Sequence, residues 1–239
     1  MEAPAYHIYP LGDRGLTIEL GKDINATTNR QVHQLFRQLQ HNPIQFVSDI
    51  IPAYSSVSII YDTNAIKKAF PHELAFDYVK GQLIDRLNSL DTYETNHLIK
   101  HIPVCYDVSL APDLKAVAAH AQISVEELIR IHTALVYTVY MIGFLPGFPY
   151  MASVDKKIQM PRKAQPQLIV PAGSVGIAGE QTGIYPLDSP GGWQLIGQTP
   201  LLLFDVALET PCLLEPGQQV QFNAISLAEF YAIKKEISA

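Results

Sequence analysis

The sequence is poor in cysteine, in tryptophan and in charge of either sign. Its 239 residues include two cysteines, one tryptophan and 17% charged residues, and the formal net charge is -6. Cys105 and Cys212 stand far apart and in no CxxC arrangement, which argues against a disulfide framework and against a zinc site. We therefore expect a reduced, cytoplasmic protein whose two thiols fill space rather than react.

The charge and hydropathy patterns also lack the features of two classes of binding protein. The net charge is negative and the lysines and arginines form no dense run, so we expect no nucleic-acid partner. No apolar run is long enough to span a bilayer, and the N-terminus has no apolar stretch of signal-peptide length. We therefore expect neither membrane insertion nor export.

Histidine and charge are missing from much of the C-terminal half. All eight histidines lie at or before His132, so a Ser-His-Asp or Cys-His site contained within that half is excluded, and we expect no metal site there. The forty residues 165–204 carry only two formal charges, those of Glu180 and Asp188. Such a segment is expected to form an uncharged ligand pocket, a face covered by another protein, or both.

The first hundred residues show an alternation of strand and helix patterns. Short apolar runs predict strands, and apolar residues spaced by three and four predict helices. The resulting order, β-β-α-β-β-α-β, predicts a small sheet with helices on one side. The strands are expected at 6–9, 16–20, 46–51, 57–61 and 97–104, and the helices at 27–40 and 73–90.

Two further helices are expected between residues 113 and 140. The second begins after Ser124, which together with Glu127 has the spacing of a capping box, and its apolar stripe runs as far as Val139. His132 falls within that stripe and is expected to be a core imidazole bonded to a backbone carbonyl. The alternative is that the helix ends at Ile142 and the next turn folds back over it, so that His132 acts as a proton donor or acceptor, which makes it a candidate catalytic residue.

The composition changes at residue 143. Nine of the fourteen glycines and eight of the seventeen prolines lie between residues 143 and 200, which predicts short strands and turns, including strands at 168–170, 201–204 and 220–222. A boundary near residues 106–112 divides the chain into an N-terminal domain, 1–106, and a C-terminal domain, 107–239.

The glycine-rich segment 173–179 has the composition of a phosphate-binding loop but not its ending. It lacks the Gly-Lys-Ser/Thr sequence and precedes no recognisable helix. We favour strands that bend and pass closely in a small barrel over nucleotide binding.

Side chains suited to binding rather than to nucleophilic attack gather in the region 143–193. Arg162 stands in a stiff loop between prolines and is expected to hold a carboxylate, with Tyr150 and Trp193 as apolar walls and Gln181 bonding an amide. We expect these residues to converge on one pocket or partner-facing cleft. The candidate ligand- or partner-binding residues are Phe144, Pro146, Gly147, Phe148, Tyr150, Arg162, Gly179, Gln181, Thr182, Tyr185, Ser189 and Trp193.

Five blocks of this region resemble those of a known family in their order and spacing. They read GFLPGFPY at 143–150, MPR at 160–162, VPAGSVGIAG at 170–179, QTGIYP at 181–186 and SPGGW at 189–193. The family is the PxpB/KipI family, once called allophanate hydrolase subunit 1. The resemblance covers nearly the whole chain and implies an α+β fold, in which a small, sandwich-like α/β domain precedes a cyclophilin-like β-barrel.

The resemblance also implies a function shared with other subunits. It implies the PxpB component of an ATP-dependent 5-oxoprolinase, which opens 5-oxo-L-proline (pyroglutamate) to L-glutamate together with PxpA-like and PxpC-like subunits. ATP, with Mg²⁺, would be used by the complex and not necessarily bound by this chain, which we expect to be inactive alone. The alternatives are a KipI-like inhibitor of a sporulation histidine kinase and a subunit of a urea- or allophanate-related carboxylase.

Overall fold

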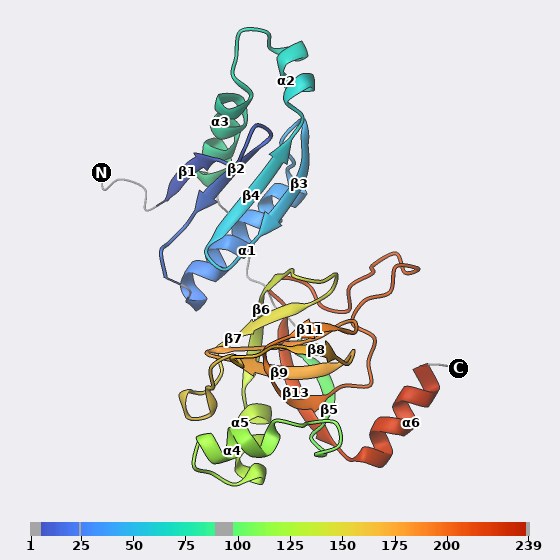
Figure 1. The fold of residues 1–239 in the computed structure, drawn as a ribbon. Coiled ribbons are helices and arrows are strands. Elements are labelled where there is room, and N and C mark those ends of the chain that lie inside the picture. Colours follow the sequence, from blue (N-terminus) through green and yellow to red (C-terminus); the bar gives the residue numbers. More distant parts are fainter. Residues whose placement is uncertain (1–5, 24, 89–97, 238–239) are drawn as a thin grey trace. The chain divides into compact units, whose positions relative to one another are not determined.

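The computed structural model describes residues 6–23, 25–88 and 98–237 (Figure 1). The chain forms two compact units, Met1–Asn96 and His97–Ala239. The division falls ten residues before the boundary expected from the sequence, because strand β5 (Lys100–Cys105) pairs with strands of the second unit. The strand expected at 97–104 is this β5, and its predicted first residue lies outside the described residues.

The first unit is an antiparallel sheet covered by helices, as the sequence pattern predicts. Its strand order is β1-β2-β4-β3. Helix α1 packs against β3 and β4 and helix α3 packs against β2, and all contribute to one apolar core (Figure 1). The strands are β1 (His7–Pro10), β2 (Gly15–Glu19), β3 (Val47–Pro52) and β4 (Ser56–Tyr61), and the helices are α1 (Ala26–His41), α2 (Thr63–Ala69) and α3 (Ala75–Asn88).

Helix α2 is the one element of this unit that the sequence pattern did not predict. It has seven residues and buries only Ile66, so it offers no apolar stripe to recognise. Its start is fixed by Asp62, whose side chain accepts hydrogen bonds from the N–H groups of Asn64 and Ala65. Residues 89 and 90, the predicted end of α3, lie outside the described part of the chain.

The second unit is a closed barrel of seven strands in the order β10-β7-β6-β13-β5-β12-β9, which confirms the expected cyclophilin-like barrel. Besides β5, its strands are β6 (Val136–Ile142), β7 (Pro149–Ala152), β9 (Ser174–Ala178), β10 (Gln181–Ile184), β12 (Gln194–Gln198) and β13 (Gln219–Ile225). β13 runs parallel to β5, and the other neighbouring pairs are antiparallel. A separate two-stranded sheet joins β8 (Gln167–Val170) to β11 (Ser189–Gly191).

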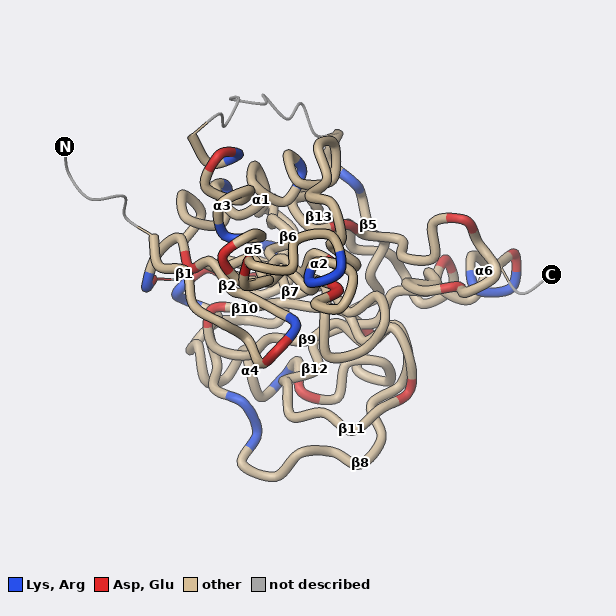
Figure 2. The backbone as a smooth tube through the Cα atoms, turned by 90° about the horizontal axis from the view of Figure 1, so that it is seen from above, with Lys and Arg blue, Asp and Glu red and all other residues tan. Residues whose placement is uncertain are grey.

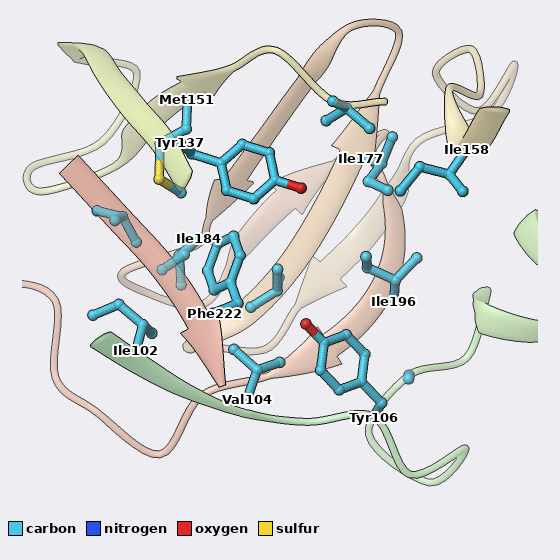
Figure 3. Packing of buried hydrophobic residues seen from close by; sticks show 14 of the residues in the cluster. Ile102, Val104, Tyr106, Tyr137, Met151, Ile158, Ile177, Ile184, Ile196 and Phe222 are labelled. Atoms are coloured by element: carbon cyan, nitrogen blue, oxygen red, sulfur yellow. The ribbon is translucent and has the colours of Figure 1, made fainter. Parts of the chain in front are cut away.

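The barrel interior is filled by aliphatic and aromatic side chains from every strand (Figure 3). The segment 173–179 contributes strand β9, which pairs with β10 and β12, so its glycines serve the barrel as expected. Helices α4 (Leu114–His120) and α5 (Val125–Ala134) pack against β12 and β13. None of the helices in the described ranges combines the length and hydropathy needed to cross a bilayer.

Two secondary-structure predictions for this unit are wrong. The helix that begins at Ser124 is capped as expected, since the Ser124 hydroxyl accepts the Glu127 N–H at 3.1 Å, but it ends at Ala134 and not near residue 140. Tyr137 and Val139 belong to β6 and point into the barrel, so their spacing is that of a strand. The segment 201–204 is not a strand and forms only the bridge between Phe204 and Cys212.

Two short elements complete the second unit. The 3₁₀ helix η1 (Lys156–Ile158) follows β7, and helix α6 (Leu227–Ile237) follows β13. The sequence pattern predicted neither element. Helix α6 buries only Phe230, which explains why no apolar stripe marks it.

Candidate functional site

Four aromatic side chains pack together on the barrel and form the outer aromatic cluster (Phe148, Tyr150, Tyr185 and Trp193). Phe148 lies at its centre, with its ring centroid 4.7 Å from that of Tyr150, 5.1 Å from Tyr185 and 5.4 Å from Trp193. The contacts with Tyr185 and Trp193 are edge-to-face, which is a favoured aromatic geometry. These rings form a cluster distinct from the barrel interior, and Trp193 is only 4% exposed.

A pair of glycines makes room for the indole of Trp193. Gly176 of β9 and Gly183 of β10 are direct partners across the two strands. An added Cβ at Gly176 would lie 3.0 Å from the Trp193 Cβ, and one at Gly183 would lie 3.0 Å from Cζ3 of the same ring. Because neither residue has a side chain, the indole lies directly against the strand backbone.

The turn 143–150 carries Phe144, an exposed aromatic residue that contacts this cluster. Phe144 has a left-handed backbone with a φ of 66°, which is unfavourable for a bulky residue, and it is nevertheless 62% exposed. Its ring meets that of Phe148 edge to face at 5.7 Å. Gly147 has a φ of 80° and approaches Leu203 so closely that a Cβ would lie 2.9 Å from the Leu203 carbonyl oxygen. Pro146 lies exposed between them.

Arg162 lies over the same cluster. Its Cζ is 5.8 Å from the ring centroid of Trp193, which is a cation–π arrangement. Burial raises the pKa of Tyr150 and of Tyr185, and the charge of Arg162 acts on both phenols in the opposite direction. The structure therefore brings Arg162 to the outer aromatic cluster, against Trp193 and near Tyr150 and Tyr185.

The other four candidates are placed by different contacts. Thr182 is fully buried and its hydroxyl bonds inside the barrel. Gly179, with a φ of 59°, forms the β9–β10 turn, where its N–H donates to the Met160 carbonyl at 2.8 Å. Gln181 is partly buried at the start of β10, and its expected bond to a ligand amide stays a prediction. Ser189 is 8% exposed in β11, and its Oγ has no hydrogen-bond partner within the described part of the chain.

His132 lies inside the barrel and not in the outer site. It is fully buried and stacks on Phe222 with ring centroids 4.6 Å apart. Its Nδ1 is 2.8 Å from the hydroxyl of Tyr106, which points into the barrel in Figure 3, and its Nε2 is 3.1 Å from Oγ1 of Thr182. The expected backbone carbonyl is therefore wrong: two side-chain hydroxyls satisfy the ring.

These contacts fix which nitrogen of His132 carries the proton. The Thr182 hydroxyl donates to the carbonyl oxygen of Gly176 at 3.0 Å, so it must accept from Nε2–H, and Nδ1 then accepts from Tyr106. Burial lowers the pKa of His132 from 6.5 to about 3, which keeps the ring neutral. The alternative in which His132 is catalytic required a helix that continues to Ile142 beneath the turn. In the structure α5 ends at Ala134, and residues 136–142 form β6.

Sequence reasoning missed the contacts that hold the Arg162 loop. The ammonium of Lys163 lies 2.6 Å from Oδ2 of Asp113, and both side chains are largely buried. The Lys163 N–H donates to the Gly192 carbonyl at 2.7 Å, and the Gln194 amide donates to the Pro161 carbonyl at 2.8 Å. Asp113 and Lys163 are fifty residues apart in the chain, so no local pattern indicates their contact.

Metal sites, reactive thiols and cavities are the other features of the described residues that could carry chemistry. Within these ranges no three His, Cys, Asp or Glu side chains are grouped so that they could hold a metal ion. Cys105 and Cys212 are free thiols, and burial raises the pKa of both. A cavity of about 350 Å³ shares no lining residue with the outer aromatic cluster; its lining includes Lys100, Asp205 and Glu215.

Comparison with known proteins decides the family. Residues 6–214 match the family model of the carboxyltransferase domain, subdomains C and D. The chain belongs to this family. Within the family it is 44% identical to the B subunit of 5-oxoprolinase from Bacillus subtilis, over 97% of this chain and 98% of that one. It is 38% identical to the B subunit of 5-oxoprolinase from Escherichia coli O157:H7, over 90% and 94% of the two chains.

A solved structure has the same fold as this chain. The crystal structure of TTHA0988 superposes with a TM-score of 0.76 at 35% identity and covers 89% of this chain. This chain spans only 40% of that longer one. The family expected from the five sequence blocks is therefore confirmed.

Proposed function

We propose that this chain is the PxpB component of a cytoplasmic, ATP-dependent 5-oxoprolinase that opens 5-oxo-L-proline to L-glutamate. The observation that carries the proposal is the 44% identity to a 5-oxoprolinase B subunit over nearly the full length of both chains. The aligned region takes in 97% of this chain and 98% of that B subunit.

The geometry of the outer site supports a component that is inactive alone. The outer aromatic cluster and Arg162 offer walls and a cation, but no nucleophile paired with a base. His132, which could act as such a base, is sealed inside the barrel with both ring nitrogens engaged. Opening a stable lactam needs activated water and stabilisation of developing charge, so companion subunits supply those groups.

The glycine-rich segment of this chain does not fit the phosphates of ATP. The glycine-rich segment 173–179 is strand β9, whose backbone pairs with β10 and β12, and Gly176 is closed over by Trp193. A phosphate-binding loop needs free backbone N–H groups, usually at the start of a helix. We assign the binding of ATP and Mg²⁺ to the PxpA-like and PxpC-like companions.

The surface around β8 supports contact with a companion. Leu168 is 86% exposed and Ile169 is 70% exposed, and as neighbours in a strand they face opposite sides of the two-stranded sheet. Figure 2 shows the tube around β8 and β11 mostly tan, in keeping with two formal charges in residues 165–204. A two-stranded sheet with apolar side chains exposed on both faces is only marginally stable in water, and a companion subunit would cover it.

Purification of the chain from its native cells, with identification of the proteins bound to it, tests this proposal. We expect PxpA-like and PxpC-like proteins in the complex. Recovery of a histidine kinase instead would favour the kinase-inhibitor alternative, and recovery of a biotin-dependent carboxylase would favour the carboxylase alternative. Either result, without the two companions, contradicts the 5-oxoprolinase assignment.

A further inference from the structure

Arg162 carries a positive charge that no other described residue neutralises. The residue is exposed, and within the described part of the chain it makes neither a hydrogen bond nor an ion pair. Its guanidinium makes a cation–π contact with the ring of Trp193. A guanidinium that lies over an aromatic ring keeps its N–H groups free for a ligand at its edge.

The backbone on both sides of Arg162 is fixed before any ligand arrives. Pro161 accepts a hydrogen bond from the side chain of Gln194, and Lys163 donates one to Gly192. Both partners flank Trp193 in the sequence, so the loop is tied to the segment that carries the indole. Ordering such a loop beforehand lowers the entropy cost of binding.

The cation next to Arg162 is already neutralised. Lys163 and Asp113 form an ion pair of 2.6 Å with side chains that are 16% and 17% exposed, and Oδ2 of Asp113 also accepts the N–H of Leu195 at 2.7 Å. The site therefore presents one positive charge rather than two. A phosphate dianion would need a further cation, whereas the planar guanidinium fork matches a single carboxylate.

We propose that Arg162 and Trp193 form a binding site for one carboxylate, and that the ion pair between Asp113 and Lys163 positions it. The ring of Tyr150 lies 5.8 Å from that of Trp193 and provides an apolar wall for the rest of the ligand. The inference rests on the proposed function only for the source of the carboxylate, which is 5-oxo-L-proline or an acidic side chain of a companion subunit.

Trp193 is the only tryptophan of the chain, so its fluorescence reports on the site directly. The isolated chain is titrated with 5-oxo-L-proline, with cyclopentanecarboxylate, and with pyrrolidin-2-one, which has the lactam but no carboxylate. If the substrate is the source, both carboxylates give a saturable change in emission and pyrrolidin-2-one gives none. Arg162→Gln then weakens carboxylate affinity about tenfold or more, as for loss of a charge-assisted hydrogen bond.

If a companion side chain is the source, the isolated chain does not respond to small carboxylates. In that case Arg162→Gln weakens binding of the copurified companion about tenfold, and salt weakens the wild-type complex. The proposal is overturned if Arg162→Gln leaves both carboxylate affinity and companion binding unchanged. Neither measurement uses 5-oxoprolinase activity, so failure of the proposed function would be seen separately.

The positioning role of the ion pair has its own test. Lys163→Met should shift the emission of Trp193 and weaken whichever interaction depends on Arg162, while Lys163→Arg should restore both. Lys157→Met is the matched control, because it breaks another ion pair of the same unit, with Glu127, at 3.7 Å. Equal effects of Lys163→Met and Lys157→Met, or none from Lys163→Met, would refute the positioning role.

Discussion

The indole of Trp193 lies against the backbone of Gly183, where a single Cβ would come within 3.0 Å of Cζ3. This contact explains why two strands of the barrel pair glycine with glycine at that level. It also fixes the plane over which Arg162 lies. The glycines of β9 and β10 thus serve the outer site as well as the barrel.

Gly183→Ala should destabilise the second unit by about 1–3 kcal/mol, the usual cost of overpacking. The added methyl would lie 2.8 Å from the Pro149 carbonyl oxygen, which belongs to a paired strand and cannot easily move. Urea unfolding followed by Trp193 fluorescence measures the change. Gly81→Ala is the control, since no atom lies within 4 Å of its Cβ, and in helix α3 it should stabilise the first unit by about 0.5–1 kcal/mol. A Gly183→Ala chain as stable as the wild type would contradict the packing described here.

The buried His132 should make the stability of the second unit depend on pH. Its pKa is lowered from 6.5 to about 3, so between these values the unfolded chain binds a proton that the folded chain does not. Stability is fully present above pH 6.5 and is lost as the pH falls toward 3, with a slope of up to about 1.4 kcal/mol per pH unit. Urea unfolding at a series of pH values measures this slope.

His132→Gln is the companion variant, because glutamine retains a donor and an acceptor for Thr182 and Tyr106 but does not titrate. The variant should lose the part of the slope that belongs to His132, even if it is less stable at neutral pH. An unchanged slope would show that other groups cause the acid sensitivity.

Leu168→Glu should leave the isolated chain folded and weaken its complex with the companions. The side chain is 86% exposed, so the substitution should change stability by less than about 0.5 kcal/mol, whereas a charge placed in an apolar interface is costly. Leu74→Glu is the control, because Leu74 is 72% exposed in the first unit. Companion affinity measured by titration should fall for Leu168→Glu alone. Equal affinities for the two variants would remove β8 from the interface.

Helices and strands with one regular spacing of apolar residues could be predicted from the sequence, and the glycine and proline content predicted the short strands of the barrel. The helix at Ala26–His41 and the strand at Ser56–Tyr61 have regular apolar patterns, and both were located within one residue at each end. The apolar residues of the region 135–139 fit both the period of a helix and that of a strand. The region forms a strand because β6 pairs with β7 and β13. Short elements such as α2, which bury one side chain, leave no pattern to find.

The candidate site divides in the same way. Arg162, Tyr150 and Trp193 could be selected because their chemistry suits binding and their segment is poor in charge. Thr182 was expected in the binding site, but successive residues of β10 face opposite sides of the barrel wall. The side chain of Thr182 points inward to His132, and it is Gly183 that faces Trp193. The ion pair of Asp113 with Lys163 depends on the closed barrel, and no spacing in the sequence encodes it.

The initial rate of glutamate formation from 5-oxo-L-proline and ATP tests whether this chain is a 5-oxoprolinase component. The rate is measured in a mixture that contains the PxpA-like and PxpC-like companions, before and after this chain is added. We expect no glutamate above background without the chain, none from the chain alone, and a saturable rate when all three are present. Full activity without this chain would show that it is not a component of the enzyme.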